Sequence, residues 1–144
     1  MSIEVEVREA SRKFYAGLNG MANGDSEPLA DVWSHGTDVT TMHPIGGREV
    51  GWTAVKGSFE GVAKLASKGK IELKDQFIRA VGGLAYEVGI ERGEFMLAGE
   101  KVAIEHRVTN IYEKQGGTWK IVHHHADISP AMIDVLKKLQ AKAA

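Results

Sequence analysis

Four long strand-like segments fill the second half of the chain and restrict the folds that it can adopt. They read IELKDQFIRAVG, LAYEVGIERGEFML, KVAIEHRVTNIYE and TWKIVHHHADI, and short links such as GG, AGEK and KQGG separate them. Links this short join antiparallel neighbours. The second half of the chain is therefore predicted to form a meander of four antiparallel strands.

An amphipathic helix is predicted at the start of the chain. Its apolar residues recur at helical spacing, and they are Ile3, Val7, Ala10, Phe14 and Leu18. The helix is expected to end near the sequence NGMANGD. A second, short helix should follow, because Ser26 can cap it and Pro28 is tolerated in its first turn.

An early strand and two further helices complete the predicted elements. TDVTTMHP is rich in β-branched residues and closed by Pro44, which indicates a strand running into a turn. A helix should run from about Trp52 to Ser67, and the last helix should be capped by Ser129 with Pro130 in its first position. This order predicts an α+β fold in which helices cover one face of a curved antiparallel sheet and enclose a cavity.

Composition narrows the classes of function. A chain of 144 residues fits one domain, so a single module over 1–144 is expected. The net charge of −1 and the lack of a Lys/Arg cluster argue against nucleic acid as a partner. Without cysteine there are no thiolate metal sites or cysteine nucleophiles. No stretch is apolar enough for a membrane span or a signal peptide, so a cytoplasmic protein that does not act at a membrane is expected.

Three consecutive histidines, His123 to His125, stand in the last predicted strand. Side chains alternate across a strand, so His123 and His125 should share the buried face with the strand's tryptophan, and His124 should face outward unless a bulge shifts the register. A zinc site could use His123 and His125 with Glu105 or His43 as a third ligand. Because alternation separates His124 from the other two, no tightly bound metal is expected.

The neighbouring strand, KVAIEHRVTNIYE, places charged and apolar residues on opposite faces. If the face of Glu105 and Arg107 lines the cavity, both side chains need partners there, since a buried unpaired charge is costly. The other face would then need a cover, and a second subunit, hence a homodimer, is expected. That apolar face carries Val102, Ile104, Val108 and Tyr112.

Two stretches, VWSHGTDVTTMHPIGGREVGWTAV and HRVTNIYEKQGGTWKIVHHHAD, resemble the SnoaL-like, ketosteroid-isomerase-like branch of the nuclear transport factor 2-like superfamily. The similarity covers nearly the whole chain, and its motifs are specific for the fold but weak for the reaction. The resemblance implies a cone-shaped α+β barrel of the cystatin-like type, with the sheet wrapped around N-terminal helices. It also implies an apolar pocket and, usually, a homodimer formed through the sheet.

The resemblance assigns roles to single residues. His43, before a proline, occupies the position of ketosteroid isomerase's carboxylate base, and Tyr15 is the nearest candidate for its oxyanion-hole tyrosine. Glu105 falls about where the oxyanion acid lies, but Arg107 would keep it ionised. Because a histidine also replaces the carboxylate base, steroid isomerisation by the familiar mechanism is not expected.

Three functions stay open at this stage. The first is a cofactor-free isomerase, cyclase or hydratase for a small apolar carbonyl compound, comparable to a ketosteroid isomerase or a polyketide-cyclase-like lyase. His43 or His125 would be its base, and Arg107 would stabilise an enolate or hold a carboxylate. The second is a non-catalytic module that binds a small ligand, and the third is a structural dimer.

The enzyme hypothesis makes a geometric prediction. His43, Arg107 and His125 should line one cavity, which would favour an anionic or carbonyl-bearing ligand. Trp33 and Trp52 should border it as parts of the core rather than as a platform for the ligand. The remaining residues expected at the pocket are Tyr15, Glu105 and His123.

Overall fold

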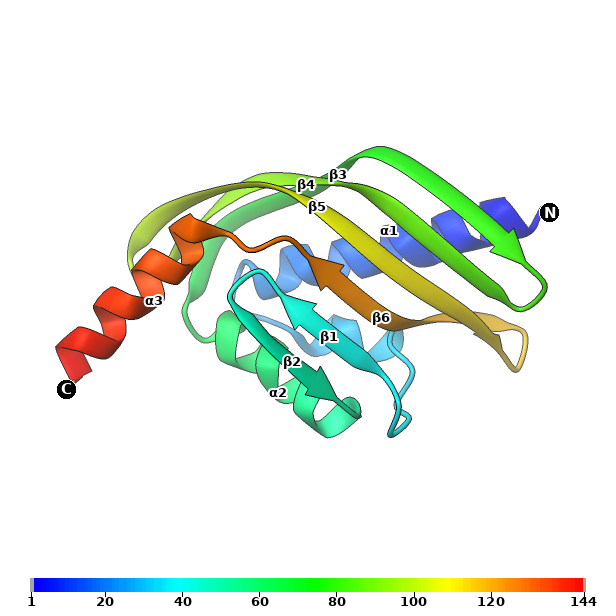
Figure 1. The fold of residues 1–144 in the computed structure, drawn as a ribbon, viewed down its shortest axis with the longest axis horizontal. Coiled ribbons are helices and arrows are strands. Elements are labelled where there is room, and N and C mark those ends of the chain that lie inside the picture. The colour runs from blue at the N-terminus through cyan, green and yellow to red at the C-terminus, as the bar shows by residue number, and fades with distance from the viewer. Residues whose placement is uncertain (1, 144) are drawn as a thin grey trace.

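The computed structural model describes residues 2–143 as one six-stranded sheet with helices against its concave face (Figure 1). The helices are α1 (Ile3–Met21), the short 3-10 helix η1 (Glu27–Asp31), α2 (Trp52–Ala63) and α3 (Pro130–Ala143). The strands are β1 (Thr40–His43), β2 (Gly46–Val50), β3 (Ala66–Val81), β4 (Leu84–Leu97), β5 (Glu100–Gln115) and β6 (Thr118–Ala126). The predicted α+β fold, with helices covering one face of a curved sheet, is confirmed.

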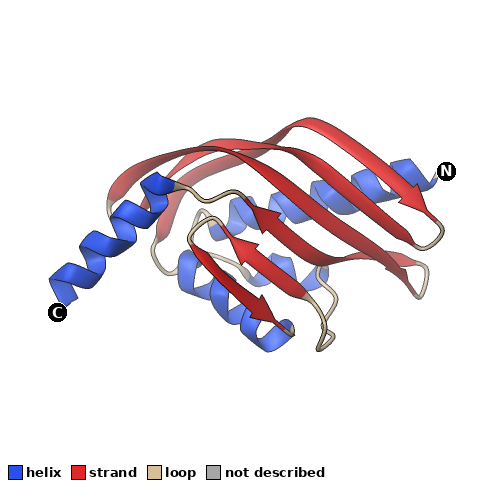
Figure 2. Ribbon diagram, in the orientation of Figure 1, coloured by secondary structure: helices blue, strands red, loops and turns tan. Residues whose placement is uncertain are grey.

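Strand order in the sheet is β2-β1-β6-β5-β4-β3. The four-stranded meander is confirmed, since β3 to β6 pair antiparallel in sequence order. β1 adds to β6 in parallel, which makes the sheet mixed, and β2 forms an edge strand that was not expected. Figure 2 shows how the sheet curves around α1, while α3 extends away from its far end.

Two helix predictions need correction at their ends. α2 stops at Ala63 instead of Ser67, because Ala66 and Ser67 already pair with Leu97 and Met96 of β4. The short helix is a 3-10 turn, and the side chain of Ser26 makes no capping hydrogen bond to it. By contrast, the backbone N–H of Met132 donates to Ser129 Oγ at 3.3 Å, as expected for the last helix.

The concave face of the sheet buries its apolar side chains against the helices. Phe14 of α1 and Tyr112 of β5 have no exposed surface. Burying a side chain such as Phe14 contributes roughly 1.5–3 kcal/mol. The apolar row of β5 belongs to this core, so the expectation that a second subunit covers it is wrong. For the same reason Glu105 and Arg107 lie on the convex, exposed face.

A β-bulge in β6 changes which histidines face the core. Ile121 pairs with Tyr112 but His123 pairs with Ile111, so Val122 is an extra residue in the ladder. Beyond it the alternation is reversed. His124 is 3% exposed and faces the helices, whereas His123 and His125 lie on the convex side. The expectation that His125 points inward and His124 outward is therefore wrong.

The β3–β4 hairpin bends around α1. Close contact between the two strands at Gly93 and a β-bulge in β3 accompany this bend. A Cβ at Gly93 would overlap the carbonyl oxygen of Lys70 and lie 2.9 Å from Ile71 Cα, so only glycine fits there. Between Lys74 and Phe77 the register shifts, and Gln76 turns toward the core. No helix formed by the described residues has the length and apolarity needed to cross a membrane.

Candidate functional site

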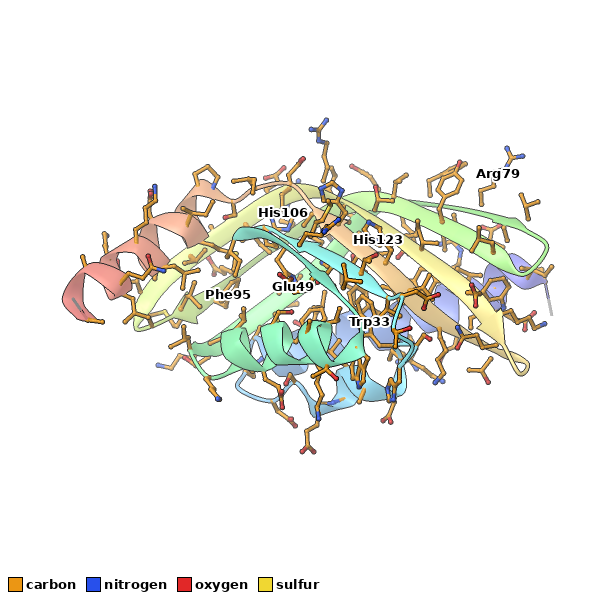
Figure 3. All side chains as sticks on the ribbon, turned by 60° about the horizontal axis from the view of Figure 1, so that its bottom comes forward. Trp33, Glu49, Arg79, Phe95, His106 and His123 are labelled. Carbon is orange, nitrogen blue, oxygen red and sulfur yellow. The ribbon has the colours of Figure 1, made fainter. Side chains whose placement is uncertain are left out.

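A partly open pocket lies between the concave face of the sheet and the three α-helices. Its walls are mainly apolar, and its volume is about 40 Å³, room for one or a few water molecules. Titratable groups in the wall come from four residues, which are His43, Glu91, His106 and His124. The side chains of Phe95 and His106, labelled in Figure 3, belong to this wall, and Glu49 borders a neighbouring hollow.

Glu91 and His106 form a buried pair on neighbouring strands β4 and β5. His106 Nε2 lies 2.8 Å from Glu91 Oε1, and the Tyr15 hydroxyl donates to Glu91 Oε2 at 2.8 Å. Burial alone would raise the pKa of Glu91, but the hydrogen bond from His106, the nearby imidazoles and Tyr15 together hold that pKa below its ordinary value. The carboxylate is therefore ionised and accepts from both neighbours.

His106 presents its other ring nitrogen without a partner. Because the Glu91 carboxylate can only accept, Nε2 donates its proton to Glu91, and in the neutral form of the ring Nδ1 holds a lone pair. His106 Nδ1 is buried and has no hydrogen-bond partner among the described residues. The pair thus combines an imidazole and a carboxylate that both line the pocket.

The tautomer of His124 follows from the amide of Asn110. Asn110 Nδ2 donates to Glu87 Oε1 at 3.0 Å and to the Tyr15 hydroxyl at 3.1 Å, which uses both amide hydrogens. Asn110 Oδ1 must then accept from His124 Nδ1, at 2.7 Å, and His124 Nε2 is left as an acceptor. Burial lowers the pKa of His124 to about 4, so the ring is neutral at pH 7.

Glu87 fixes which atoms donate and which accept in the hydrogen bonds of Asn110 and His124. It is fully buried on β4 and accepts from Gln76 Nε2 at 2.6 Å, from the Tyr112 hydroxyl at 2.8 Å and from Asn110. A carboxylate with three donors around it requires that the amide of Asn110 turn its nitrogen toward it. Glu87 therefore orients Asn110, and through Asn110 it orients His124.

His43 stands at the end of β1, on another part of the pocket wall. Its Nε2 lies 2.7 Å from Ser58 Oγ and 3.3 Å from Glu49 Oε1. Ser58 gives its hydroxyl hydrogen to the carbonyl of Val55, so it accepts from His43 Nε2 and leaves His43 Nδ1 as an acceptor. Burial lowers the pKa of His43, although Glu49 and Glu91 oppose this effect.

Arg107 and His125 do not reach this pocket. Both lie on the convex face of the sheet, where they border an open hollow of about 490 Å³. Arg107 is paired with Asp127 by contacts of 2.7 and 3.2 Å, and 81% of its side chain is exposed. The predicted cavity shared by His43, Arg107 and His125 is therefore wrong. Since none of the described residues in the pocket wall is an arginine or lysine, the expected preference for anions loses its basis.

Two further residues predicted at the pocket also lie on the convex face. Glu105 pairs there with Arg92 at 3.0 Å, and both side chains are more than half exposed. His123 is only partly buried, and its Nδ1 lies 2.7 Å from Thr40 Oγ1. Neither can act on a ligand in the concave pocket.

Three aromatic residues predicted at the pocket do not line it. Tyr15 is buried and touches Glu91 instead of the cavity. Trp33 is fully buried in the core, beside α2 in Figure 3. Trp52 stacks on His35 with ring centroids 4.4 Å apart, at the edge of a separate surface hollow.

Sequence reasoning missed Glu91, His106 and His124 as site residues. The sequence contained a signal for two of them, because each is a polar side chain on an otherwise apolar strand face. Glu91 lies on the face of Phe95 and Leu97. His106 lies between Ile104 and Val108. His124 had no such signal, since the bulge at Val122 depends on pairing with β5. Among the described residues, no three side chains of metal-binding type stand close enough to hold an ion.

Comparison with known proteins identifies relatives of the chain. Residues 7–132 match the SnoaL-like domain family. None of the curated proteins matches the chain in sequence. A crystal structure from Streptomyces avermitilis, provisionally named as a dehydratase of the NTF2-like family, superposes with a TM-score of 0.73, at 23% identity over 88% of this chain and 95% of that one.

Two other solved structures illustrate the range of proteins with this fold. One from Novosphingobium aromaticivorans, provisionally named as an aromatic ring hydroxylase, gives a TM-score of 0.75 at 16% identity, covering 89% of this chain and 91% of that one. The association domain of CaMKII from C. elegans gives 0.66 at 17% identity, covering 86% and 96%. At these identities the likeness shows the fold alone.

Proposed function

Because the chain belongs to the SnoaL-like family, we propose that it is a cofactor-free enzyme in which His106 moves a proton of a small molecule bound in the concave pocket. The proposal is carried by one observation, the buried Nδ1 of His106 without a partner among the described residues. Leaving such an atom unpaired costs roughly 1–3 kcal/mol, and unsatisfied groups of this kind often mark functional sites. His106 replaces His43 and His125 as the proposed base.

Glu91 gives His106 the properties of a general base. Its Oε1, 2.8 Å from Nε2, keeps the proton on that nitrogen and directs the lone pair of Nδ1 away from itself. When Nδ1 takes a proton, the adjacent carboxylate stabilises the imidazolium, as in other carboxylate–histidine pairs. Tyr15 holds the second oxygen of Glu91 and is a positioning residue, because it does not line the pocket.

The favoured reaction class is loss of water from a hydroxylated carbonyl compound. His106 Nδ1 takes a proton from the carbon beside the carbonyl, and the C–H electron pair forms a C=C bond while the C–O bond breaks. The imidazolium then returns that proton to the departing hydroxide, which leaves as water, so one histidine serves both transfers. The provisional name of the Streptomyces avermitilis relative agrees with this class. An isomerase would share the first step and return the proton to another carbon.

A second candidate is a module that binds a small ligand without reaction. The pocket volume of about 40 Å³ does not distinguish this function from catalysis, because it is below the several hundred Å³ usual for any small-molecule pocket. In both functions the occupant must displace side chains from the wall.

A test compound with one acidic C–H bond distinguishes the enzyme from the binding module. 5-Nitrobenzisoxazole is small and uncharged, and removal of its one acidic C–H proton opens the ring to a coloured phenolate. We expect the protein to accelerate this reaction, and His106→Asn to reduce the rate by about 100-fold or more. His125→Asn, on the convex face, is the matched control and should keep the wild-type rate. A wild-type rate no faster than that of His106→Asn would reject the enzyme and favour the binding module.

We also propose a homodimer, formed through the convex face of β3 and β4. This face exposes several large apolar side chains, which are Phe77, Val81, Leu84, Tyr86 and Val88. The rings of Phe77 and Tyr86 lie 6.3 Å apart and form the centre of the patch. A second copy would cover it, and association domains occur among the proteins of similar fold.

A further inference from the structure

We propose that the concave pocket selects an uncharged ligand with two hydroxyl groups, which donate to His43 Nδ1 and His124 Nε2. This inference rests on the proposed function only in taking the concave pocket as the ligand site. It adds the class of compound and the two side chains that recognise it.

Hydrogen-bond directions make both imidazoles acceptors. His43 Nε2 donates to Ser58 and His124 Nδ1 donates to Asn110, so each ring has one nitrogen left, and that nitrogen carries a lone pair. The two donations are forced, because Ser58 spends its hydrogen on Val55 and Asn110 spends both amide hydrogens elsewhere. Burial holds the pKa of each ring below its ordinary value, so neither becomes a donor at pH 7.

The two rings are spaced for hydroxyl groups on neighbouring carbons. Their centroids lie 6.1 Å apart, because β1 and β6 are adjacent and Thr41 pairs with His124. Phe59 stands near both rings, at 4.9 Å from His43 and 6.5 Å from His124, and provides an apolar wall beside them. A flat or cyclic compound with vicinal hydroxyls suits this arrangement.

Charge in the wall excludes anionic ligands. Among residues 2–143, Glu91 is the one carboxylate that lines the pocket, and no arginine or lysine stands beside it in the wall; its lowered pKa keeps it ionised. A ligand carboxylate or phosphate would lose its hydration and meet a negative charge without a compensating cation. An uncharged ligand avoids this cost.

Entry of such a ligand requires movement of Met132 of α3, whose side chain closes one side of the pocket. Methionine is unbranched and changes rotamer readily, so it can retreat without disturbing the strands. Of the described residues of α3, only Met132 and Val135 are buried, which leaves the helix lightly attached.

Thermal unfolding with three probes of similar shape tests the inference. Catechol has two adjacent hydroxyls, veratrole has both methylated, and benzoate carries a negative charge. We expect catechol at millimolar concentration to raise Tm by about 2 °C or more, and veratrole and benzoate to leave it unchanged. No shift with catechol, an equal shift with veratrole, or a larger shift with benzoate would each refute the inference.

Variants and a spectroscopic signal locate the binding site. His124→Asn and His43→Asn should each abolish the catechol shift, whereas His125→Asn should retain it. If a buried variant unfolds, the ¹⁵N NMR spectrum of histidine-labelled wild-type protein tests the same contact. Catechol must shift the signal of His124 Nε2, and veratrole must not. Acceleration of 5-nitrobenzisoxazole without catechol binding would refute this inference alone, while catechol binding without acceleration would refute the proposed catalysis alone.

Discussion

Glu91 and Glu87 lie four residues apart on β4 and serve different purposes. Glu91 lines the pocket and holds His106, whereas Glu87 is fully buried behind it and accepts from neutral donors. A buried carboxylate is tolerated only when its oxygens are satisfied, and in both cases they are. At the scale of single residues, the site therefore depends on hydrogen-bond direction as much as on residue type.

Glu87→Gln is expected to disturb His124 without touching the pocket. The new amide nitrogen would replace one carboxylate oxygen and face either the donor of Gln76 or those of Asn110 and Tyr112, so the free energy of unfolding should fall by roughly 1–3 kcal/mol. The Asn110 amide would lose its fixed orientation, and ¹⁵N spectra should show His124 in a mixture of tautomers. Glu105→Gln, at an exposed position, is the control and should change stability by less than about 0.5 kcal/mol. An unchanged single tautomer of His124 would contradict the proposed role of Glu87.

Acid should destabilise the protein in a window set by His124. Its pKa falls from the ordinary value of 6.5 to about 4 on folding, so between these values the unfolded chain binds more protons than the folded one. Stability is complete above pH 6.5 and declines as the pH falls toward 4, by up to about 3 kcal/mol. The lowered pKa of His43 adds to this loss, and that of Glu91 extends it to lower pH.

Denaturant unfolding at a series of pH values measures this effect. His124→Asn should flatten the slope between pH 6.5 and 4, whereas His125→Asn, whose ring lies on the convex face, should preserve it. Equal slopes for the wild type and His124→Asn would show that His124 does not titrate as stated.

Among the elements, α3 is the one that we propose controls access to the pocket. The other helices pack along the concave face, while α3 leaves the body of the molecule after Pro130 and touches the pocket through Met132 (Figure 1). We propose that α3 is the part of the pocket wall that moves when a ligand enters. β1, β4, β5 and β6 carry the polar groups on a rigid sheet.

Met132→Ala is expected to open the pocket. Removing a buried methionine side chain costs about 2–5 kcal/mol, with the lower end expected at a helix so lightly attached. The variant should nevertheless bind catechol more tightly than the wild type does, because the ligand no longer displaces a side chain. Leu139→Ala, on the exposed part of α3, is the control and should leave both properties unchanged. Weaker catechol binding by Met132→Ala would contradict the position of this wall.

At the scale of the whole molecule, the two proposed functions, chemistry and assembly, belong to opposite faces of the sheet. The concave face holds the buried polar network, and the convex face exposes an apolar patch over β3 and β4 beside the Arg107–Asp127 pair. Assembly through the convex face would leave the pocket accessible.

Phe77→Glu is expected to separate the proposed dimer. Light scattering of the wild type should give twice the chain mass of 15.6 kDa, and the variant should give the mass of one chain. Phe77 is 55% exposed in the single chain, so the substitution should not unfold it. Val50→Glu, at an equally exposed position on the edge strand β2, is the control and should remain dimeric. A wild-type mass near 15.6 kDa at micromolar concentration would rule the dimer out.

Local patterns in the sequence were enough to determine the meander, α1 and the start of α3, because periodicity, short links and capping residues act within a few positions of one another. The pattern of β5 also showed that its charged and apolar residues stand on opposite faces. Only the tertiary structure decided that the apolar face is the concave one, since this depends on packing against α1 and α2. It also decided that His124 enters the site, because the bulge at Val122 arises from the register with β5, a pairing between distant segments that no local pattern encodes.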